Sequence, residues 1–490
     1  MAFTNSRLVW LWISVLTLSL SAFLTVAVYG SLQRIPSDVR VGDWVIGDLT
    51  LPEFEKQLEE KKKSLSAFKI RLHVEGGRLS AERTLQQLGL EMNTQEVLAR
   101  LEPLTYGSPF QRAVYRWRLR HEVLTLIPRF PEEKVQGALK EAFREVYARQ
   151  PINARRVIGP DDTIRHIPEI RVQHIDEEKL KEQLEKLLSS WETLCGSENQ
   201  PLSLDVPMRT VDPQITLRTL QEQGIIRKIS EFTTNFPNTQ SPAVSSEGRV
   251  HNVRSTAASL QDVLLKPGEV FDYAPYIEQT EKRFGFKEAP VIVNGKLVPG
   301  IGGGICQVSS TLYNAVLRAG LTVVERRNHS LPVSYVPLGQ DATFASGHIN
   351  FKFRNSTEHA VLIRTATDRH SLTVKLFGQT PPDITYEVKS ETVATLAPPV
   401  KYVLNPSLKI GVQETISKGK PGYIVETYRY KKQNGRLVSK EKLSRDTYTA
   451  QPTIIASNSG TGASGRSSLA PGADKPKLLI EDGVQGPHFR

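Results

Sequence analysis

One long apolar segment stands out near the start of the chain. No charged residue lies between Leu8 and Tyr29, and about 20 such residues at 1.5 Å each span the hydrocarbon core of a membrane. The segment is longer than the core of a signal peptide, and no clear small-x-small cleavage site precedes Arg34. It also lacks the polar stripe of a helix packed inside a soluble domain. The pattern therefore predicts an uncleaved signal anchor over residues 1–30 with the bulk of the chain outside the cytoplasm; a cleaved signal peptide is the alternative.

Amphipathic helices alternate with short strands between residues 38 and 240. Thr50 has the pattern of a helix cap followed by an apolar face, and the alternation over residues 67–85 predicts a hairpin with a Gly-Gly turn. Residues 88–104 and 170–187 share one order of strand, acidic cap and amphipathic helix, a weak internal repeat that predicts two related α+β units. The histidines of this region are scattered, so we expect it to bind or to act as a spacer.

The spacing of apolar residues changes after residue 247. It predicts a helix that runs as far as Leu264, then a Lys-Pro-Gly turn and a strand. Further on, the glycine-rich stretch 300–304 leads into a second helix, whose apolar residues recur at helical spacing up to Gly320. Cys306 therefore lies at the N-terminus of this second helix. We expect residues 247–378 to form one domain that mixes helices and strands.

Alternating residues predict a β-rich module over residues 384–456, with a hairpin turn at Asn434 and Gly435. The segment after it, residues 457–490, begins with a stretch rich in glycine, serine and proline, which predicts disorder. Together the patterns predict a multidomain α+β protein. In it an N-terminal transmembrane helix precedes two small α+β units, a mixed α/β domain and a β-rich module.

Composition limits the partners. The chain has 490 residues, which predicts about three domains, and its 63 lysines and arginines against 52 acidic residues leave a net charge of +11. Outside the cytoplasm such a surplus attracts the membrane surface or the anionic polymers of a cell wall. No helix-turn-helix, finger or RNA-recognition pattern appears, so we expect no nucleic-acid partner. The two cysteines, Cys195 and Cys306, are too few for a cysteine framework or a cysteine-rich zinc module.

Cys306 is the strongest candidate for chemistry. Free N–H groups and the positive end of the helix dipole favour its thiolate. The N–H groups around Ile305, Cys306 and Gln307 could stabilise the oxyanion formed when a thiolate attacks a carbonyl. A glycine-rich turn can also cradle phosphate, but no Gly-Lys-Ser/Thr end follows, which disfavours a nucleotide loop. An inert, tightly packed cysteine is the other interpretation, and it is the preferred one for Cys195.

A cysteine nucleophile needs a base, and His329 is the first candidate. It follows a strand predicted at residues 321–326 and could return toward the head of the helix. Asp341, in a turn, could orient the imidazole as the third member of a triad, or only bond its own backbone. His348 is the second-choice base. These three residues and Cys306 could in principle hold a metal, but no close ligand pair such as H-x-x-x-H supports this, so we expect no metal and no cofactor.

The region contains, in this order, the stretches RVHNVRSTAASL, KPGEVFDY, GGGICQVSSTLYNAVLRAGL, RNHSLPVSYVPLGQDATF and FKFRNST. Together they resemble the VanW domain of bacterial cell-envelope proteins over residues 247–378. Residues 38–240 are more loosely similar to a peptidoglycan-binding domain that often precedes VanW domains and L,D-transpeptidases. Residues 384–456 resemble an extracellular module named for five glycines, with a plain β spacer as the alternative.

Two positions depart from the family pattern. After the Pro-Gly turn the family usually reads Phe-Ser-Phe, where this chain has Phe271, Asp272 and Tyr273. Before a later Leu-Lys-Phe the family usually has an acidic residue, where this chain has Asn350. The second departure leaves Asp341 as the expected carboxylate partner of the histidine.

The resemblance implies work on the cell wall. Some VanW-domain proteins are regarded as cysteine-dependent L,D-transpeptidases, and others are named only from glycopeptide-resistance clusters. It implies Cys306 as the nucleophile and His329 as the general base, with Gly303, Gly304 and Gln307 shaping the oxyanion site. We therefore expect a membrane-anchored acyl transferase that acts on the stem peptides of peptidoglycan. The alternative is a non-catalytic peptidoglycan-binding or scaffold protein, for instance an accessory to glycopeptide resistance.

Overall fold

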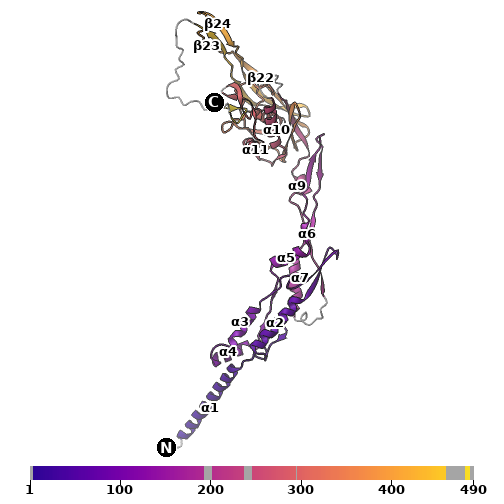
Figure 1. Cartoon of the computed structure of the whole chain (residues 1–490), viewed down its shortest axis with the longest axis vertical. Helices are drawn as coiled ribbons and strands as arrows, with labels where there is room; N and C mark the ends of the chain where they lie inside the picture. The colour runs from indigo at the N-terminus through magenta and orange to yellow at the C-terminus, as the bar shows by residue number, and fades with distance from the viewer. Residues whose placement is uncertain (1–3, 192–200, 237–245, 294, 459–479, 486–490) are drawn as a thin grey trace. The chain divides into compact units, whose positions relative to one another are not determined.

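The computed structural model describes residues 4–191, 201–236, 246–293, 295–458 and 480–485 (Figure 1). The chain divides into two compact units, each discontinuous in sequence: Met1–Asn153 with Glu169–Gln214, and Ala154–Pro168 with Ile215–Arg490. We call them unit 1 and unit 2 and describe each by itself. Cys195 lies outside the described residues.

Unit 1 begins with the apolar helix and continues as short helices and small sheets. Its elements are α1 (Thr4–Ser31), β1 (Arg40–Val41), β2 (Trp44–Val45), α2 (Leu51–Ala67), β3 (Lys69–Val74), β4 (Leu79–Thr84), β5 (Glu91–Met92), α3 (Thr94–Leu101), η1 (Glu102–Leu104), α4 (Pro109–Leu119), β6 (Val123–Leu124), β7 (Pro128–Arg129), α5 (Glu132–Ala142), α6 (Arg144–Ala148), β10 (Val172–Ile175), α7 (Glu177–Leu187), η2 (Leu188–Ser190), β11 (Leu202–Asp205) and β12 (Met208–Val211). Helix α1 covers the predicted apolar segment and is long and apolar enough to cross a membrane.

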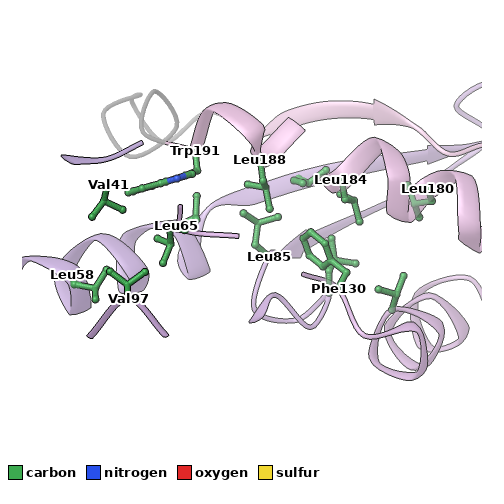
Figure 2. Packing of buried hydrophobic residues seen from close by; sticks show 14 of the residues in the cluster. Val41, Leu58, Leu65, Leu85, Val97, Phe130, Leu180, Leu184, Leu188 and Trp191 are labelled. Carbon is green, nitrogen blue, oxygen red and sulfur yellow. The ribbon is translucent and has the colours of Figure 1, made fainter. Parts of the chain in front are cut away.

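One hydrophobic core joins both repeated segments of unit 1. Val97 of α3 and Leu180 of α7 belong to a single cluster of buried residues that also contains Phe130 (Figure 2). The two segments therefore form one unit and not the pair of units that the repeat predicts. The local predictions are confirmed, because Thr50 and Glu53 cap α2 reciprocally and β3 pairs with β4 as a hairpin.

Unit 2 holds the region of Cys306 and the β-rich module. Its elements are β8 (Arg155–Ile158), β9 (Ile164–Ile167), α9 (Leu217–Glu222), β13 (Arg227–Asn235), α10 (Ser246–Ser259), β14 (Val263–Leu265), β15 (Val270–Asp272), α11 (Ala274–Phe284), β16 (Glu288–Val293), β17 (Lys296–Ile301), α12 (Ile305–Arg318), β18 (Thr322–Glu325), β19 (Lys352–Arg354), β20 (Val361–Thr367), β21 (Ser371–Gly378), β22 (Ile384–Leu396), β23 (Val400–Leu404), β24 (Gln413–Ser417), β25 (Gly422–Gln433), β26 (Arg436–Tyr448), β27 (Thr453–Ser457) and β28 (Ile480–Glu481).

An antiparallel sheet of the order β13-β21-β20-β14 carries the helices of unit 2, and α10 and α12 pack against it. Every residue of α12 from Ile305 to Leu317 is buried, because a loop covers the polar side of the helix. Ser309 Oγ donates to the main-chain oxygen of Ala342 at 2.7 Å, and Asn314 Nδ2 donates to that of Gln340 at 2.7 Å. The loop that contains Asp341 is therefore held directly on α12.

Two boundaries inferred from the sequence are wrong. Helix α10 ends at Ser259 and β14 begins at Val263, so the helix does not reach Leu264. Asp262 has a φ of 62°, a left-handed backbone that separates the helix from a strand paired with β20. The N-terminal region, expected to end at residue 240, ends earlier, because β13 pairs with β21 in the sheet of unit 2.

The β-rich module consists of two three-stranded sheets, β22-β25-β26 and β23-β27-β24. Asn434 and Gly435, with φ values of 48° and 76°, form the predicted hairpin turn between β25 and β26. Every residue of β23 and β24 is exposed. This part of unit 2 therefore presents strand surface that the rest of the described chain does not cover.

The described end of the chain returns to unit 2. β28 pairs antiparallel with β16, and residues up to Gln485 continue along β17. The prediction of disorder over residues 457–490 is therefore wrong for Ile480–Gln485. It is also wrong for Ser457, the last residue of β27, and for Asn458, which donates to the main-chain oxygen of Leu408. Residues 459–479 and 486–490 lie outside the described residues.

Candidate functional site

The glycine-rich stretch brings the head of α12 close to β16. Gly302 and Gly304 have φ values of 91° and 111°, which L side chains rarely adopt. A Cβ on Gly303 would lie 2.4 Å from the main-chain oxygen of Pro290 in β16. The glycines thus permit both the turn and the contact, and they place Cys306 in the first turn of a helix as expected.

The Cys306 thiol is completely buried. Its Sγ accepts a hydrogen bond from the main-chain N–H of Phe344 at 3.0 Å and donates to the main-chain oxygen of the same residue at 3.4 Å. Burial, followed by the charge of Asp482, raises the pKa of the thiol well above its usual range. The expectation that the helix N-terminus lowers this pKa is therefore wrong for this conformation, because desolvation outweighs the donors.

A carboxylate from the end of the chain lies on the head of α12. Asp482 Oδ1 accepts hydrogen bonds from the main-chain N–H groups of Cys306 at 2.8 Å and Gly304 at 3.1 Å. Its Oδ2 pairs with Arg249 Nη1 at 3.1 Å. Two convergent N–H groups and a guanidinium thus hold one negatively charged oxygen pair beside the thiol.

The donors differ from those expected at this helix. The N–H of Ile305 donates to Gly302 and that of Gln307 donates to Gly304, so Gly304 and Cys306 supply the two N–H groups that face the carboxylate. The Gln307 side chain does not face the carboxylate but binds Arg249 and the main chain of Asn235. Its Oε1 accepts from Arg249 Nη2 at 3.3 Å, while its Nε2 donates to the main-chain oxygen of Asn235 at 3.0 Å. Gln307 therefore positions the arginine that binds the carboxylate.

His329 and Asp341 form a completely buried pair. Asp341 Oδ2 lies 2.7 Å from both the main-chain nitrogen and the Nδ1 of His329. Burial disfavours the charged imidazole, but the hydrogen bond and charge of Asp341 outweigh it and raise the pKa of His329. Burial likewise opposes the charged carboxylate, yet His329 and then Arg326 lower the pKa of Asp341 to about 2. Asp341 thus orients the imidazole and does more than bond its own turn.

The second ring nitrogen of His329, Nε2, does not bind Asp341. His329 Nε2 is buried and has no hydrogen-bond partner among the described residues, and no hydrogen bond joins it to Cys306 in this part of the chain. The Tyr335 hydroxyl is likewise buried without a partner in the described structure. Burial and then the charges of Asp482 and Cys306 raise its pKa. Two unsatisfied polar atoms therefore belong to the surroundings of the thiol and the bound carboxylate.

The second-choice base lies elsewhere. His348 is exposed in the turn between Ala345 and Ile349, and the structure brings its ring to none of the other candidate residues it describes. Asn350 donates to Asp272 Oδ1 at 2.7 Å, so the two positions that depart from the family pattern contact each other and not His329. Within the described ranges no group of three histidine, cysteine or acidic side chains could hold a metal ion.

Several residues of this site were not expected from the sequence. Arg249 opens one of the recognised stretches and so carried a signal, whereas Asp482 followed a short apolar run in a segment expected to be disordered. Arg326 and Tyr448 carried no signal. They bind Asp341 Oδ1 at 3.3 Å and 2.5 Å, although Tyr448 comes from the end of the β-rich module.

Comparison with known families agrees with this architecture. The family described as VanW like protein matches residues 248–377, and the G5 domain family matches residues 387–458. The chain contains a VanW-like domain and a C-terminal G5 domain. The head of α12, the His329–Asp341 pair and the covering loop all belong to the VanW-like domain, and Tyr448 belongs to the G5 domain.

Two curated proteins are similar to part of the chain. Over 178 residues it is 35% identical to the uncharacterized protein YoaR of Bacillus subtilis. The match covers 36% of this chain and 56% of YoaR. Over 161 residues it is 30% identical to the vancomycin B-type resistance protein VanW of Enterococcus faecalis. That match covers 32% of this chain and 58% of the resistance protein. The chain thus spans little more than half the length of the curated relatives that it matches.

Two solved structures are similar to a part of the chain. The IgA1 protease G5 domain is 25% identical, covers 16% of this chain and 93% of its own, and has a TM-score of 0.14. The HP0197-G5 crystal structure is 22% identical in sequence, covers 15% of this chain and 97% of its own, and has a TM-score of 0.11.

Proposed function

We propose that this protein is a membrane-anchored, extracytoplasmic acyl transferase of the L,D-transpeptidase type, and that its VanW-like domain acts on peptidoglycan stem peptides through a thioester at Cys306. One observation carries the proposal. The N–H groups of Gly304 and Cys306 converge on a single anionic oxygen next to the thiol. Asp482 Oδ1 there stands in for the oxyanion of a tetrahedral intermediate, which needs the same two donors.

The first half-reaction forms the thioester. The Cys306 thiol gives its proton to His329, and the thiolate attacks the carbonyl between the third and fourth residues of a donor stem peptide. The carbonyl electron pair moves onto oxygen, where the N–H groups of Gly304 and Cys306 stabilise it. When the pair returns, the C–N bond breaks, and His329 protonates the amine of the departing D-amino acid.

The second half-reaction transfers the acyl group. An acceptor amine attacks the thioester and His329 takes its proton. The C–S bond then breaks, and His329 passes the proton to the departing sulfur, which restores the thiol and the neutral imidazole. Asp341 holds the imidazole through Nδ1 and leaves Nε2 free for both steps. Without a partner among the described residues, Nε2 is in the state that a base needs before its substrate binds.

A second function is favoured by a different observation. The thiol is completely buried, its pKa is raised by burial, and the main chain of Phe344 already binds its Sγ. A cysteine of this kind suits a packing role, and the protein would then be a non-catalytic peptidoglycan-binding or scaffold protein. The acyl-transfer proposal therefore requires that the site open before substrate enters.

The partners proposed are peptidoglycan and anionic wall polymers, with the membrane bound through α1. The exposed strands β23 and β24 of the G5 domain and the net charge of +11 support binding to acidic wall material. Sacculus pull-down of the full chain should persist after Cys306→Ala. If binding vanishes completely at modest salt, the interaction with the wall is only non-specific charge attraction.

Fractionation tests the membrane anchor, since recovery of a soluble product that begins near Ser31 would contradict an uncleaved anchor.

The catalytic proposal is tested by trapping the intermediate. The detergent-solubilised full chain is incubated with disaccharide-tetrapeptide, and peptide-level mass spectrometry locates any acyl adduct. We expect an adduct on Cys306 and cross-linked product with the wild type and with Cys195→Ala, the matched control, but neither with Cys306→Ala. Product from Cys306→Ala would refute the role of Cys306 as nucleophile, and no adduct from the wild type would favour the scaffold function.

A further inference from the structure

Residues Ile480–Gln485 lie along unit 2 as an added strand. Ile480 and Glu481 pair antiparallel with Val293 and Ile292 of β16. The segment then crosses to β17, where the main chain of Ile301 donates to Gln485 O at 2.7 Å and accepts from the N–H of Val484 at 2.9 Å. Main-chain pairing of this kind is how an extended peptide ligand binds an open strand edge.

Two neighbouring carboxylates of the segment, Glu481 and Asp482, are buried and accept hydrogen bonds from unit 2. Asp482 binds the head of α12 and Arg249. Glu481 Oε2 accepts from the main-chain N–H of Ser330 at 2.9 Å and from its Oγ at 3.0 Å, directly after His329 in the chain. We call the surface that holds this segment, formed by β16, β17 and the head of α12, the groove. Because buried carboxylates need donors of this kind, the groove suits a ligand with negative charge at two adjacent positions.

Arg249, which binds the Asp482 carboxylate, is itself held by two neighbours. Arg249 is held by Gln307 and lies with its guanidinium 5.6 Å from the ring centre of Tyr335. His329 is completely buried, and its Nε2 has no partner among the described residues. The same surroundings therefore contain a bound carboxylate and an unsatisfied polar atom, two independent signs of a ligand site.

The segment itself contributes little to the hydrophobic core. None of the six residues is a buried member of the described core clusters, and Val484 alone packs on one of them, partly buried. Among the described residues its attachment consists mainly of main-chain hydrogen bonds, the ion pair of Asp482 with Arg249 and the contacts of Glu481 with Ser330. A second peptide with the same groups could make every one of these contacts.

We infer that the groove formed by β16, β17 and the head of α12 binds an extended acidic peptide, and that the chain's own Ile480–Gln485 fills it as a displaceable internal ligand. The ligand class is a peptide that pairs through its main chain and places a carboxylate on Arg249 and the N–H groups of Gly304 and Cys306. The inference rests on the proposed function only where this ligand is identified with the acyl donor. A donor must then replace Asp482 before its carbonyl can reach the oxyanion donors.

Peptide binding in trans tests the groove. The probe is a fluorescently labelled hexapeptide of the sequence IEDGVQ, capped at both ends, and its anisotropy reports binding to the detergent-solubilised full chain. A tethered segment competes at an effective concentration near the millimolar range. We therefore expect the double variant Glu481→Ala/Asp482→Ala to bind the probe at least tenfold more tightly than the wild type. A hexapeptide with asparagine in place of its aspartate should bind that variant at least tenfold more weakly.

The matched control is Glu278→Ala/Glu281→Ala, which removes the same charge from exposed positions of α11 and should bind the probe like the wild type. Equal affinity of the wild type and the Glu481→Ala/Asp482→Ala variant, equal affinity for the two hexapeptides, or no binding to that variant would overturn the inference.

A measurement on the wild type guards against a variant that misfolds. In hydrogen exchange read by mass spectrometry, millimolar unlabelled hexapeptide should speed exchange of the amides of residues 480–485 and leave those of α12 protected. Unchanged exchange at residues 480–485 would count against a displaceable segment.

The acyl-enzyme assay separates this inference from the proposed function. Hexapeptide binding as expected without any adduct on Cys306 would remove the enzymatic function and keep the groove. An adduct that forms equally fast in the wild type and in Glu481→Ala/Asp482→Ala, with no hexapeptide binding, would keep the enzyme and remove the groove. If both hold, the double variant should form the adduct at least tenfold faster.

Discussion

Replacing Asp341 with asparagine removes the negative charge at the centre of a buried network in unit 2. The carboxylate accepts two hydrogen bonds from His329, one from the Tyr448 hydroxyl at 2.5 Å and one from Arg326 at 3.3 Å. Asparagine has the same shape and leaves no cavity. One of its two terminal groups is a donor, however, so it faces a donor of the protein whichever way it points.

Two contributions set the size of the loss. The pKa of Asp341 falls from its ordinary value of 3.8 to about 2, and at about 1.4 kcal/mol per pH unit this difference corresponds to about 2 kcal/mol. A buried donor left without an acceptor costs about 1–3 kcal/mol more. The expected loss in free energy of unfolding is therefore about 3–5 kcal/mol, as for the breaking of other buried ion pairs.

The loss should depend on pH in a defined direction. Because the pKa of Asp341 is lowered, its stabilisation is present above pH 3.8 and is lost as the pH falls toward about 2. Because the pKa of His329 is raised, its stabilisation is present below pH 6.5 and is lost as the pH rises through the folded value. The variant lacks both contributions. The difference between wild type and variant should therefore be largest between about pH 4 and pH 6.5.

Hydrogen exchange of the α12 amides, read by mass spectrometry on the full chain, reports this loss in unit 2 alone. A loss of 3 kcal/mol corresponds to roughly a hundredfold faster opening or more. The control Asp383→Asn alters a carboxylate whose side-chain hydrogen bond within the described residues comes from the Gln433 amide at 2.8 Å, and we expect a change of about 0.5 kcal/mol or less. A loss below about 1 kcal/mol for Asp341→Asn, or one independent of pH, would refute the reasoning.

Three further predictions concern single positions. Thr50→Ala removes the reciprocal cap of α2 and should cost about 1 kcal/mol, measured by exchange of the α2 amides with those of α7 as reference. Gly320→Ala meets a ring atom at 2.3 Å and has a φ of 75°, whereas Gly347→Ala has a φ of 73° with nothing within 4 Å. The first should lower the thermal stability of unit 2 clearly more than the second. His329→Gln should leave a residual rate of adduct formation, because the oxyanion donors persist.

The predictions that held depend on residues close together in sequence. The cap at Thr50, the turn at Asn434 and Gly435, and the helix that begins beside Cys306 are each decided within about four positions. The predicted strand at 321–326 is observed as β18, which covers Thr322–Glu325. Local patterns were sufficient here because one hydrogen bond or one backbone conformation decides the outcome.

The predictions that failed depend on partners far away. Val263 and Leu264 fit the helical pattern, but pairing with β20 draws them into a strand. Ile480–Gln485 follow a stretch of disorder-prone composition, yet β16 and β17 accept them as an added strand. A pattern read along the chain contains no information about an open strand edge elsewhere.

By itself the sequence determined the apolar helix, the VanW-like and G5 domains, and the position of Cys306 at a helix N-terminus. The tertiary structure alone decided how that cysteine behaves. Asp482 lies 176 residues away from it in sequence, and complete burial in the packed domain, followed by the charge of Asp482, raises the thiol pKa although the Phe344 N–H opposes this. Desolvation and charge depend on what surrounds a group in space, and only the packed fold specifies those surroundings.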